Sequence, residues 1–217
     1  MRNLLLILFT SVLFSGCGSL QGQNKDVQQF VKKVVQTYNE KNSEKFNQLI
    51  HKNTGLTFIT TIGTNNTWFK VSKVCLDKKC LDSGMAESAG VPYQSLLEGY
   101  KTGDLNTNAI EFTEKPYFEC DKVEKQGIFV ASENKFHALS ESINFFLGHA
   151  PDILGEELEP KKKNELVKDL EKYKKIETKS RRVTVNSKDG TFIFYITNID
   201  GKWFLTVLDF ASGDCSV

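Results

Sequence analysis

Three acid–base residues recur at helical spacing in the middle of the chain. Glu133, His137 and Glu141 occupy positions i, i+4 and i+8, so a helix through them would place two carboxylates and an imidazole on one face. Such a group can transfer a proton or bind a metal ion. We predict no metal site, because a single helix supplies too few ligands to complete one. His51 and His149 have no partner that the sequence identifies.

A serine in the segment Ala86-Glu87-Ser88-Ala89-Gly90 is the nearest approach to a nucleophile motif. The segment resembles a nucleophile elbow, which needs a strand before the serine and a helix after it. Neither flank fits, because turn-like residues precede Ser88 and Pro92 follows it closely. The sequence therefore favours a serine in a surface loop.

Two acidic residues lie close to aromatic residues near the C-terminus. Asp200 and Asp209 border Trp203 and Phe204, and a carboxylate beside aromatic rings can have a raised pKa. Turn chemistry explains Asp200, because it directly precedes a glycine. Asp209 lacks that explanation, but the sequence identifies no second catalytic group beside it. We therefore assign no catalytic residue and no cofactor.

The first seventeen residues have the layout of an export signal. Arg2 is followed by an apolar run from Leu4 to Phe14 and then by Ser15-Gly16-Cys17, which matches the charged, apolar and small-residue regions of a secretory signal peptide. The run is shorter than the roughly 20 apolar residues that a membrane-spanning helix needs. The pattern therefore favours cleavage.

The segment Phe14-Ser15-Gly16-Cys17 resembles the lipobox of bacterial lipoproteins, with Phe14 where that family usually has an aliphatic residue. The resemblance implies that residues 1–16 are removed as a signal peptide and that Cys17 is lipidated. More than one acyl chain would make anchoring to the membrane durable. Gly18 after the cysteine resembles the outer-membrane sorting pattern of Gram-negative lipoproteins. Ordinary secretion without lipid is the alternative.

The remaining cysteines are suited to disulfides. An even number of cysteines in an oxidising compartment indicates bridges, and four of them allow three connectivities. We predict one bridge between Cys75 and Cys80, because the polar turn between them can close to the Cα separation of about 5.5 Å that a disulfide requires. The second would join Cys120 to Cys215. Zinc is the rival interpretation, but histidine is scarce and the paired C-x-x-C spacing is missing.

The hydrophobic pattern predicts four helices in one α+β domain, residues 26–217, joined to Cys17 by a flexible tether, residues 17–25. Apolar residues at helical spacing predict a helix over Asp26–Tyr38, and Ser43 would cap a shorter second helix, so that the two form an N-terminal helical hairpin. A third helix should begin at Ser132 and end before Gly148 and Pro151. A fourth should follow Pro160.

The strands are predicted to form an antiparallel sheet that ends in a C-terminal β-meander. The meander would comprise Arg182–Asn186, Thr191–Ile199 and Lys202–Phe210, with Asp-Gly turns between them. Apolar residues occupy both faces of Thr191–Ile199, so both faces should be largely buried and at least one helix should cover the sheet. Earlier strands are expected at residues 56–62, 68–71, 116–120 and 127–130.

Helices followed by strands and a final hairpin around Ile199–Leu205 resemble the nuclear-transport-factor-2-like α+β cone. The two helices between Ser132 and Ile176 depart from the usual element order of that family. The resemblance therefore supplies an expectation of fold and no site residue.

Charge argues against nucleic acid as a partner, because 28 basic and 27 acidic residues leave a net charge of +1. The lysine-rich stretch Lys161–Arg182 has interleaved charges, which indicates a solvated helix. Contact of that stretch with anionic lipid near the anchor is the alternative.

These observations favour a non-catalytic binding or interaction module in the bacterial cell envelope. Its partners would be the membrane, through the lipid, and an envelope protein or small-molecule ligand. The long Leu81–Leu105 excursion is a candidate contact loop, and a pocket lined by Trp203, Phe204 and Tyr195 is a second version. The alternative is an envelope hydrolase, which would require Asp209, His137 or Glu119 to converge in one cleft.

Overall fold

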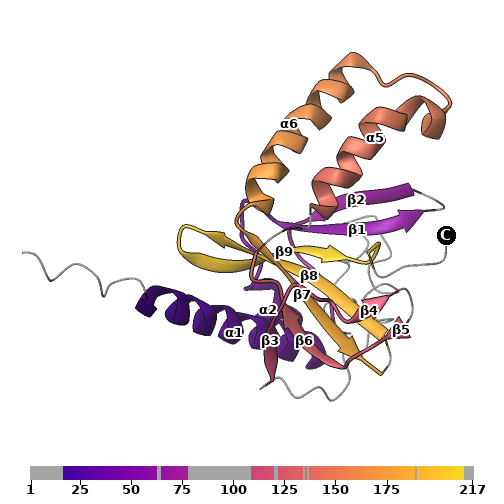
Figure 1. The fold of residues 1–217 in the computed structure, drawn as a ribbon. Helices are drawn as coiled ribbons and strands as arrows, with labels where there is room; N and C mark the ends of the chain where they lie inside the picture. The colour runs from indigo at the N-terminus through magenta and orange to yellow at the C-terminus, as the bar shows by residue number, and fades with distance from the viewer. Residues whose placement is uncertain are drawn as a thin grey trace, which may run out of the picture.

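A seven-stranded sheet with helices on both faces organises the molecule (Figure 1). The computed structural model describes residues 17–62, 65–77, 109–119, 122–133, 135, 137–188 and 190–212, with side chains from residue 24 onward except that of Ile62. The helices are α1 (Cys17–Asn39), α2 (Ser43–Asn47), α5 (Ala138–Leu154) and α6 (Pro160–Glu177). The strands are β1 (Leu56–Ile62), β2 (Asn65–Val71), β3 (Ile110–Phe112), β4 (Phe118–Glu119), β5 (Lys122–Val123), β6 (Gly127–Val130), β7 (Ser180–Ser187), β8 (Gly190–Ile199) and β9 (Lys202–Asp209).

The large sheet has the strand order β2-β1-β9-β8-β7-β6-β3 and is mostly antiparallel. Its centre is the predicted β-meander of β7, β8 and β9, so the α+β fold class is confirmed. Two neighbouring pairs run parallel: β1 beside β9, and β3 beside β6. Strands β4 and β5 form a separate small antiparallel pair.

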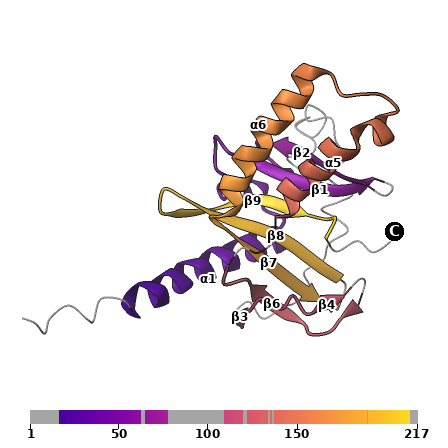
Figure 2. The same ribbon diagram turned by 45° about the horizontal axis from the view of Figure 1, so that its top comes forward.

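The two faces of β8 contribute to two separate cores. Phe192, Phe194 and Ile196 pack with apolar residues of α1 and α2. Ile193 and Tyr195 point to the other face, where they pack with apolar residues of α5 and α6. Figure 2 shows the same arrangement, with α1 on one side of the sheet and the α5–α6 pair on the other. The prediction that both faces of this strand are buried and that at least one helix covers the sheet is confirmed. Helices cover both faces, because alternate residues on a central strand point in opposite directions.

The N-terminal helices differ from the prediction. Helix α1 begins at Cys17, so the predicted flexible tether is helical, because a helix held by packing from Val27 onward gains a hydrogen bond with each residue added. Helix α2 has only five residues, and a helical hairpin is not clearly formed. Its N-cap is Asn42, not Ser43, and the Asn42 side chain accepts a bond from the Lys45 amide at 2.9 Å.

Helix α5 also differs at both ends. It begins at Ala138 rather than Ser132, and it continues through Gly148 and Pro151 to Leu154. Gly155 ends it in the left-handed conformation, with φ of 74°. Helix α6 begins with Pro160 at its first position, and Leu166, Leu170 and Tyr173 are buried, as the sequence predicts. No helix in the described part of the chain is long and apolar enough to span a membrane.

Several predicted features lie outside the described residues. They are the signal peptide over residues 1–16, the Leu81–Leu105 loop with Ser88, and Cys80, Cys120 and Cys215. Cys75 is buried and disulfide-bonded. The cysteine pairing therefore stays a prediction.

Candidate functional site

A pocket of about 350 Å³ lies where the start of α5 meets the sheet. It is lined by residues of β2 and β8 and by the first two turns of α5. His137, directly before α5, and Ser212, after β9, complete the lining. The lining residues are Asn66, His137, Ala138, Glu141, Ser142, Phe145, Tyr195 and Ser212. Polar and apolar groups therefore share the surface of the pocket about equally, with one aromatic ring contributed by α5 and one by the sheet.

A β-bulge sits in the sheet beside the pocket. The register of β8 and β9 shifts after Tyr195, which pairs with Val207, whereas Ile196 pairs with Leu205. The shift leaves Thr206 as the extra residue on β9. Bulges redirect side chains and are frequent next to functional sites, so this irregularity helps to set the direction of Tyr195.

Asp209 holds the hydroxyl groups behind the pocket in place. Its Oδ2 atom accepts bonds from the Ser212 hydroxyl at 2.6 Å and from the Tyr195 hydroxyl at 3.4 Å. Its Oδ1 atom accepts from the backbone amides of Ala211 at 3.1 Å and Ser212 at 2.9 Å. The carboxylate thereby anchors both Tyr195 and Ser212, two of the groups that line the pocket.

Burial controls the protonation of this cluster. Burial raises the pKa of Asp209, while its bonds to Ser212 and Ala211 and the charge of Arg182 lower it, with a net increase. Burial also raises the pKa of Tyr195 well above its ordinary value, and the neighbouring Asp209 adds to the increase. Tyr195 therefore presents a neutral phenol to the pocket.

The raised pKa of Asp209 predicts a specific dependence of stability on pH. The Asp209 carboxyl group holds its proton more tightly in the folded chain than in the unfolded chain. Above about pH 4, the ordinary pKa of Asp, folding is therefore accompanied by proton uptake at Asp209. The free energy of unfolding contributed by Asp209 should therefore fall as the pH rises from about 4 through its folded-state pKa. We expect Asp209→Asn to remove this fall, as measured by urea denaturation across a pH series. The control variant Asp200→Asn, in an exposed turn, should retain the fall. If the free energy of unfolding depended on pH with the same slope in the wild type and in Asp209→Asn, the prediction would be wrong.

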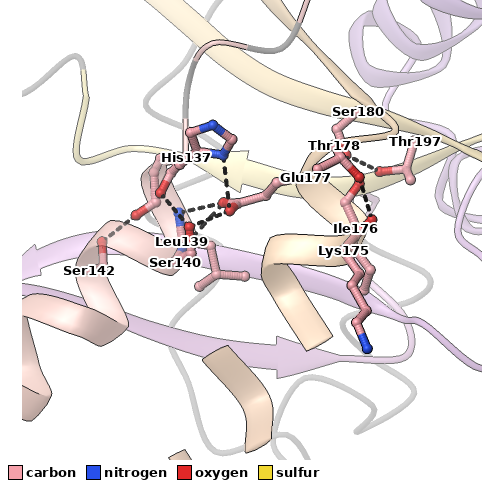
Figure 3. A network of polar contacts seen from close by, with 11 residues as sticks. His137, Leu139, Ser140, Ser142, Lys175, Ile176, Glu177, Thr178, Ser180 and Thr197 are labelled. Atoms are coloured by element: carbon pink, nitrogen blue, oxygen red, sulfur yellow. Dashed lines mark hydrogen bonds and ion pairs between the residues drawn. The ribbon is translucent and has the colours of Figure 1, made fainter. Parts of the chain in front are cut away.

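Glu177, at the end of α6, closes the N-terminus of α5 from another part of the chain (Figure 3). Its Oε1 atom accepts bonds from the backbone amides of Leu139 at 3.0 Å and Ser140 at 3.2 Å. Its Oε2 atom accepts from the Ser140 hydroxyl at 2.5 Å. The N-cap residue His137 makes no side-chain capping bond of its own, so Glu177 provides the acceptor that a local cap would normally supply.

His137 connects the capped helix end to the pocket. Its Nδ1 atom lies 3.6 Å from Oε2 of Glu177, and its side chain is 40% exposed. The predicted face of Glu133, His137 and Glu141 is wrong, because α5 begins only after His137. Glu133 instead lies 4.0 Å from Lys135, while His137 and Glu141 do share the pocket. No cluster of potential metal ligands occurs in the described residues.

The other candidates from the sequence lie elsewhere. Asp200 occupies the β8–β9 turn with φ of 51°, as turn chemistry predicts. Glu119 lies on the small β4–β5 pair. Of the three aromatic residues predicted to line a pocket, Tyr195 does so, whereas Phe204 stacks edge-on against His51 at 4.8 Å and Trp203 packs against the α1 core.

Sequence reasoning missed Glu177, Asn66, Ser142 and Ser212. Glu177 is one acidic residue among many on a charged helix, and only its place at the helix end next to apolar Ile176 sets it apart. Asn66 and Ser142 come together across the fold, with Nδ2 of Asn66 donating to Oγ of Ser142 at 3.4 Å. No local pattern marks such a pair.

Comparison with known proteins adds no further information on this site. No family model, curated protein or solved structure matches the chain.

Proposed function

We propose that the protein is a lipid-anchored lipoprotein of the bacterial cell envelope whose folded domain binds a small polar ligand in the Tyr195 pocket. The lipobox-like segment ending at Cys17 supports the anchor and the envelope location. The observation that carries the binding function is the pocket itself, about 350 Å³ in volume and lined by polar groups from separate elements. A volume of this size suits a small molecule.

The lining defines the chemistry of the ligand. Tyr195 and Ser212 supply hydroxyl groups held by Asp209, and Asn66 supplies an amide. Exposed Glu141 contributes a carboxylate, and half-buried His137 contributes an imidazole. Phe145 adds an apolar ring that is 46% exposed. A ligand with several hydrogen-bonding groups and one apolar edge matches this surface.

An envelope hydrolase is the second candidate, because two of its three expected residues approach this pocket. His137 lines it, and Asp209 lies directly behind Tyr195 and Ser212, whereas Glu119 is on β4. Nucleophilic catalysis needs a hydroxyl bonded to a base. Within the described residues the Ser140 hydroxyl donates to Glu177 and the Ser212 hydroxyl to Asp209, so neither serves His137. The geometry therefore supports binding better than catalysis.

Native mass spectrometry of the full-length protein, extracted gently from bacterial membranes, tests both parts of the proposal. We expect a chain that begins at lipidated Cys17 and carries a small bound molecule. Glu141→Trp should abolish the bound mass by filling the pocket, and Asn144→Trp should keep it. Both positions are exposed on α5, but only Glu141 lines the pocket.

Each part of the proposal has its own contrary result. A mature chain without lipid would overturn the anchor. A lipidated chain that carries no small molecule, or that loses it equally in both tryptophan variants, would overturn binding in this pocket.

A further inference from the structure

A second depression, of about 610 Å³, lies between α6 and the hairpin of β8 and β9. We call it the lysine groove. One wall is the exposed side of α6, and the other is the end of β8 with its turn. The lining residues are Thr54, Val167, Lys168, Glu171, Lys172, Lys175, Ile176, Lys179, Thr197, Asn198, Ile199 and Asp200.

Four lysines form a stripe along this groove. Lys168, Lys172, Lys175 and Lys179 follow one another at intervals of four, three and four residues, which places them on one side of a helix and its continuation. In the described part of the chain none of the four forms an ion pair. The groove therefore has an excess of positive charge that no acidic residue of the described segments pairs.

The two acidic residues of the groove do not cancel this charge. Glu171 lies 3.4 Å from Lys174, which is not part of the groove. Asp200 is in the turn at the opposite wall. Asn198 and apolar Ile199 also belong to that wall, so an anion entering the groove would meet ammonium groups on one side and the Asn198 amide on the other.

Lys70 of β2 shows that cations are crowded nearby. Burial lowers the pKa of Lys70, and the positive charge of Lys172 lowers it further, while Asp169 opposes the decrease. The charge of Lys172 thus acts on a second lysine as well as on the groove. A bound anion would relieve this repulsion between like charges.

The groove lies near the same end of the sheet as the start of α1, although α6 and α1 pack on opposite faces of that sheet. In Figures 1 and 2 the β8–β9 turn and the N-terminal end of α1 both project toward the left, and the C-terminal end of α6 lies near that turn. Nη1 of Arg181, next to the groove in sequence, donates to Oδ1 of Asn24 on α1 at 3.2 Å. The β8–β9 turn, which lines the groove, therefore lies at the end of the sheet where α1 begins at Cys17.

We propose that the lysine groove binds anionic head groups of the membrane that holds the lipid anchor, so that the domain has a fixed orientation on the surface. This inference rests on the proposed anchor. A surface with negative lipid attracts each nearby lysine, and salt weakens the attraction. Val167, which is 45% exposed at the rim, adds an apolar contact at the lipid boundary.

Lysine acetylation followed by mass spectrometry tests the contact on the full-length lipidated protein in vesicles. One set of vesicles contains phosphatidylcholine alone, and the other contains phosphatidylcholine with phosphatidylglycerol. We expect acetylation of the four groove lysines to slow about fivefold on the anionic vesicles at low salt and to recover in high salt. Lys161, Lys162 and Lys163, exposed at the far end of α6, serve as internal controls and should not change.

A pair of matched variants separates the groove from general charge. One carries Lys→Gln at the four groove positions, and the other carries it at Lys161, Lys162, Lys163 and Lys174. Hydrogen exchange of the Thr197–Asp200 backbone should slow on anionic vesicles in the wild type and in the second variant, but not in the first. Equal slowing in both variants would overturn the proposal.

The remaining outcomes are equally decisive. Equal protection of the groove on neutral and anionic vesicles would overturn a role for anionic lipid. Protection produced by inorganic phosphate in the presence of neutral vesicles would overturn it as well. A protein that stays on the vesicles through a carbonate wash but shows no lipid-dependent protection would overturn this inference alone. A protein that the wash removes would overturn the anchor instead.

Discussion

Replacing Glu177 by alanine should lower the free energy of unfolding by about 3 kcal/mol, because one buried carboxylate accepts three bonds at the start of α5. Without it the amides of Leu139 and Ser140 lose their acceptor in a region where Leu139 is 1% and Ser140 is 5% exposed. An unsatisfied buried donor costs about 1–3 kcal/mol, and loss of a helix cap costs about 1 kcal/mol. Urea denaturation followed by circular dichroism measures the loss.

Two further variants define the role of Glu177. Glu171→Ala, at an exposed position on the same helix, should change stability by less than about 0.5 kcal/mol. Glu177→Gln keeps an amide oxygen that can accept hydrogen bonds from the α5 backbone amides. Its free energy of unfolding should therefore fall less than that of Glu177→Ala. If Glu177→Ala matched Glu171→Ala, the cap would contribute nothing measurable and the interpretation would be wrong.

Replacing Phe194 by alanine should lower the free energy of unfolding by about 4 kcal/mol, the middle of the range for a phenylalanine removed from a packed core. Phe194 is fully buried on the central strand β8, where it faces the core formed with α1 and α2. Helices on both sides and strands β7 and β9 on either edge restrict collapse around the cavity. Chemical denaturation at constant pH gives the change directly.

Phe145→Ala is the matched control for this substitution. Phe145 is 46% exposed and stacks on His149 with ring centroids 4.2 Å apart, so its removal leaves no internal cavity and should cost less than about 1 kcal/mol. A similar loss in both variants would show that the two-sided core does not dominate stability.

The central sheet was predictable because its signals are local. Alternation of Phe192, Phe194 and Ile196 with Ile193 and Tyr195 predicts a strand buried on both faces, and the structure confirms it. The Asp200-Gly201 turn has positive φ values of 51° and 79°, as an Asp-Gly hairpin requires. Residues near one another in sequence decide both features.

The ends of α5 were not predictable for the opposite reason. Gly148 and Pro151 have the local pattern of a helix end, yet packing of Ile143 and Ala150 keeps the helix intact through both. Its start depends on Glu177, which is distant in sequence and whose role appears only when α6 lies beside it. The parallel pairing of β1 with β9 depends on equally distant residues and leaves no periodic signal.

The candidate site divides in the same way. His137 and Asp209 were candidates because of local sequence signals: His137 has acidic residues at helical spacing, and Asp209 is an unexplained acid near aromatic rings. No sequence pattern distinguishes Ser142, Ser212 and Asn66 from other serines and asparagines. Only the fold assembles Asn66 of β2 with Ser142 of α5.

The β1–β9 pairing also sets the order in which the chain can fold. Thr57, Phe58 and Ile59 pair with Val207, Leu208 and Asp209, so an early hairpin joins the sheet only after the last strand has formed. Contacts between distant segments carry a high entropic cost before they give any stabilisation, and they slow folding. A chain that leaves a ribosome or a membrane channel N-terminus first therefore stays incomplete until nearly all of it has emerged.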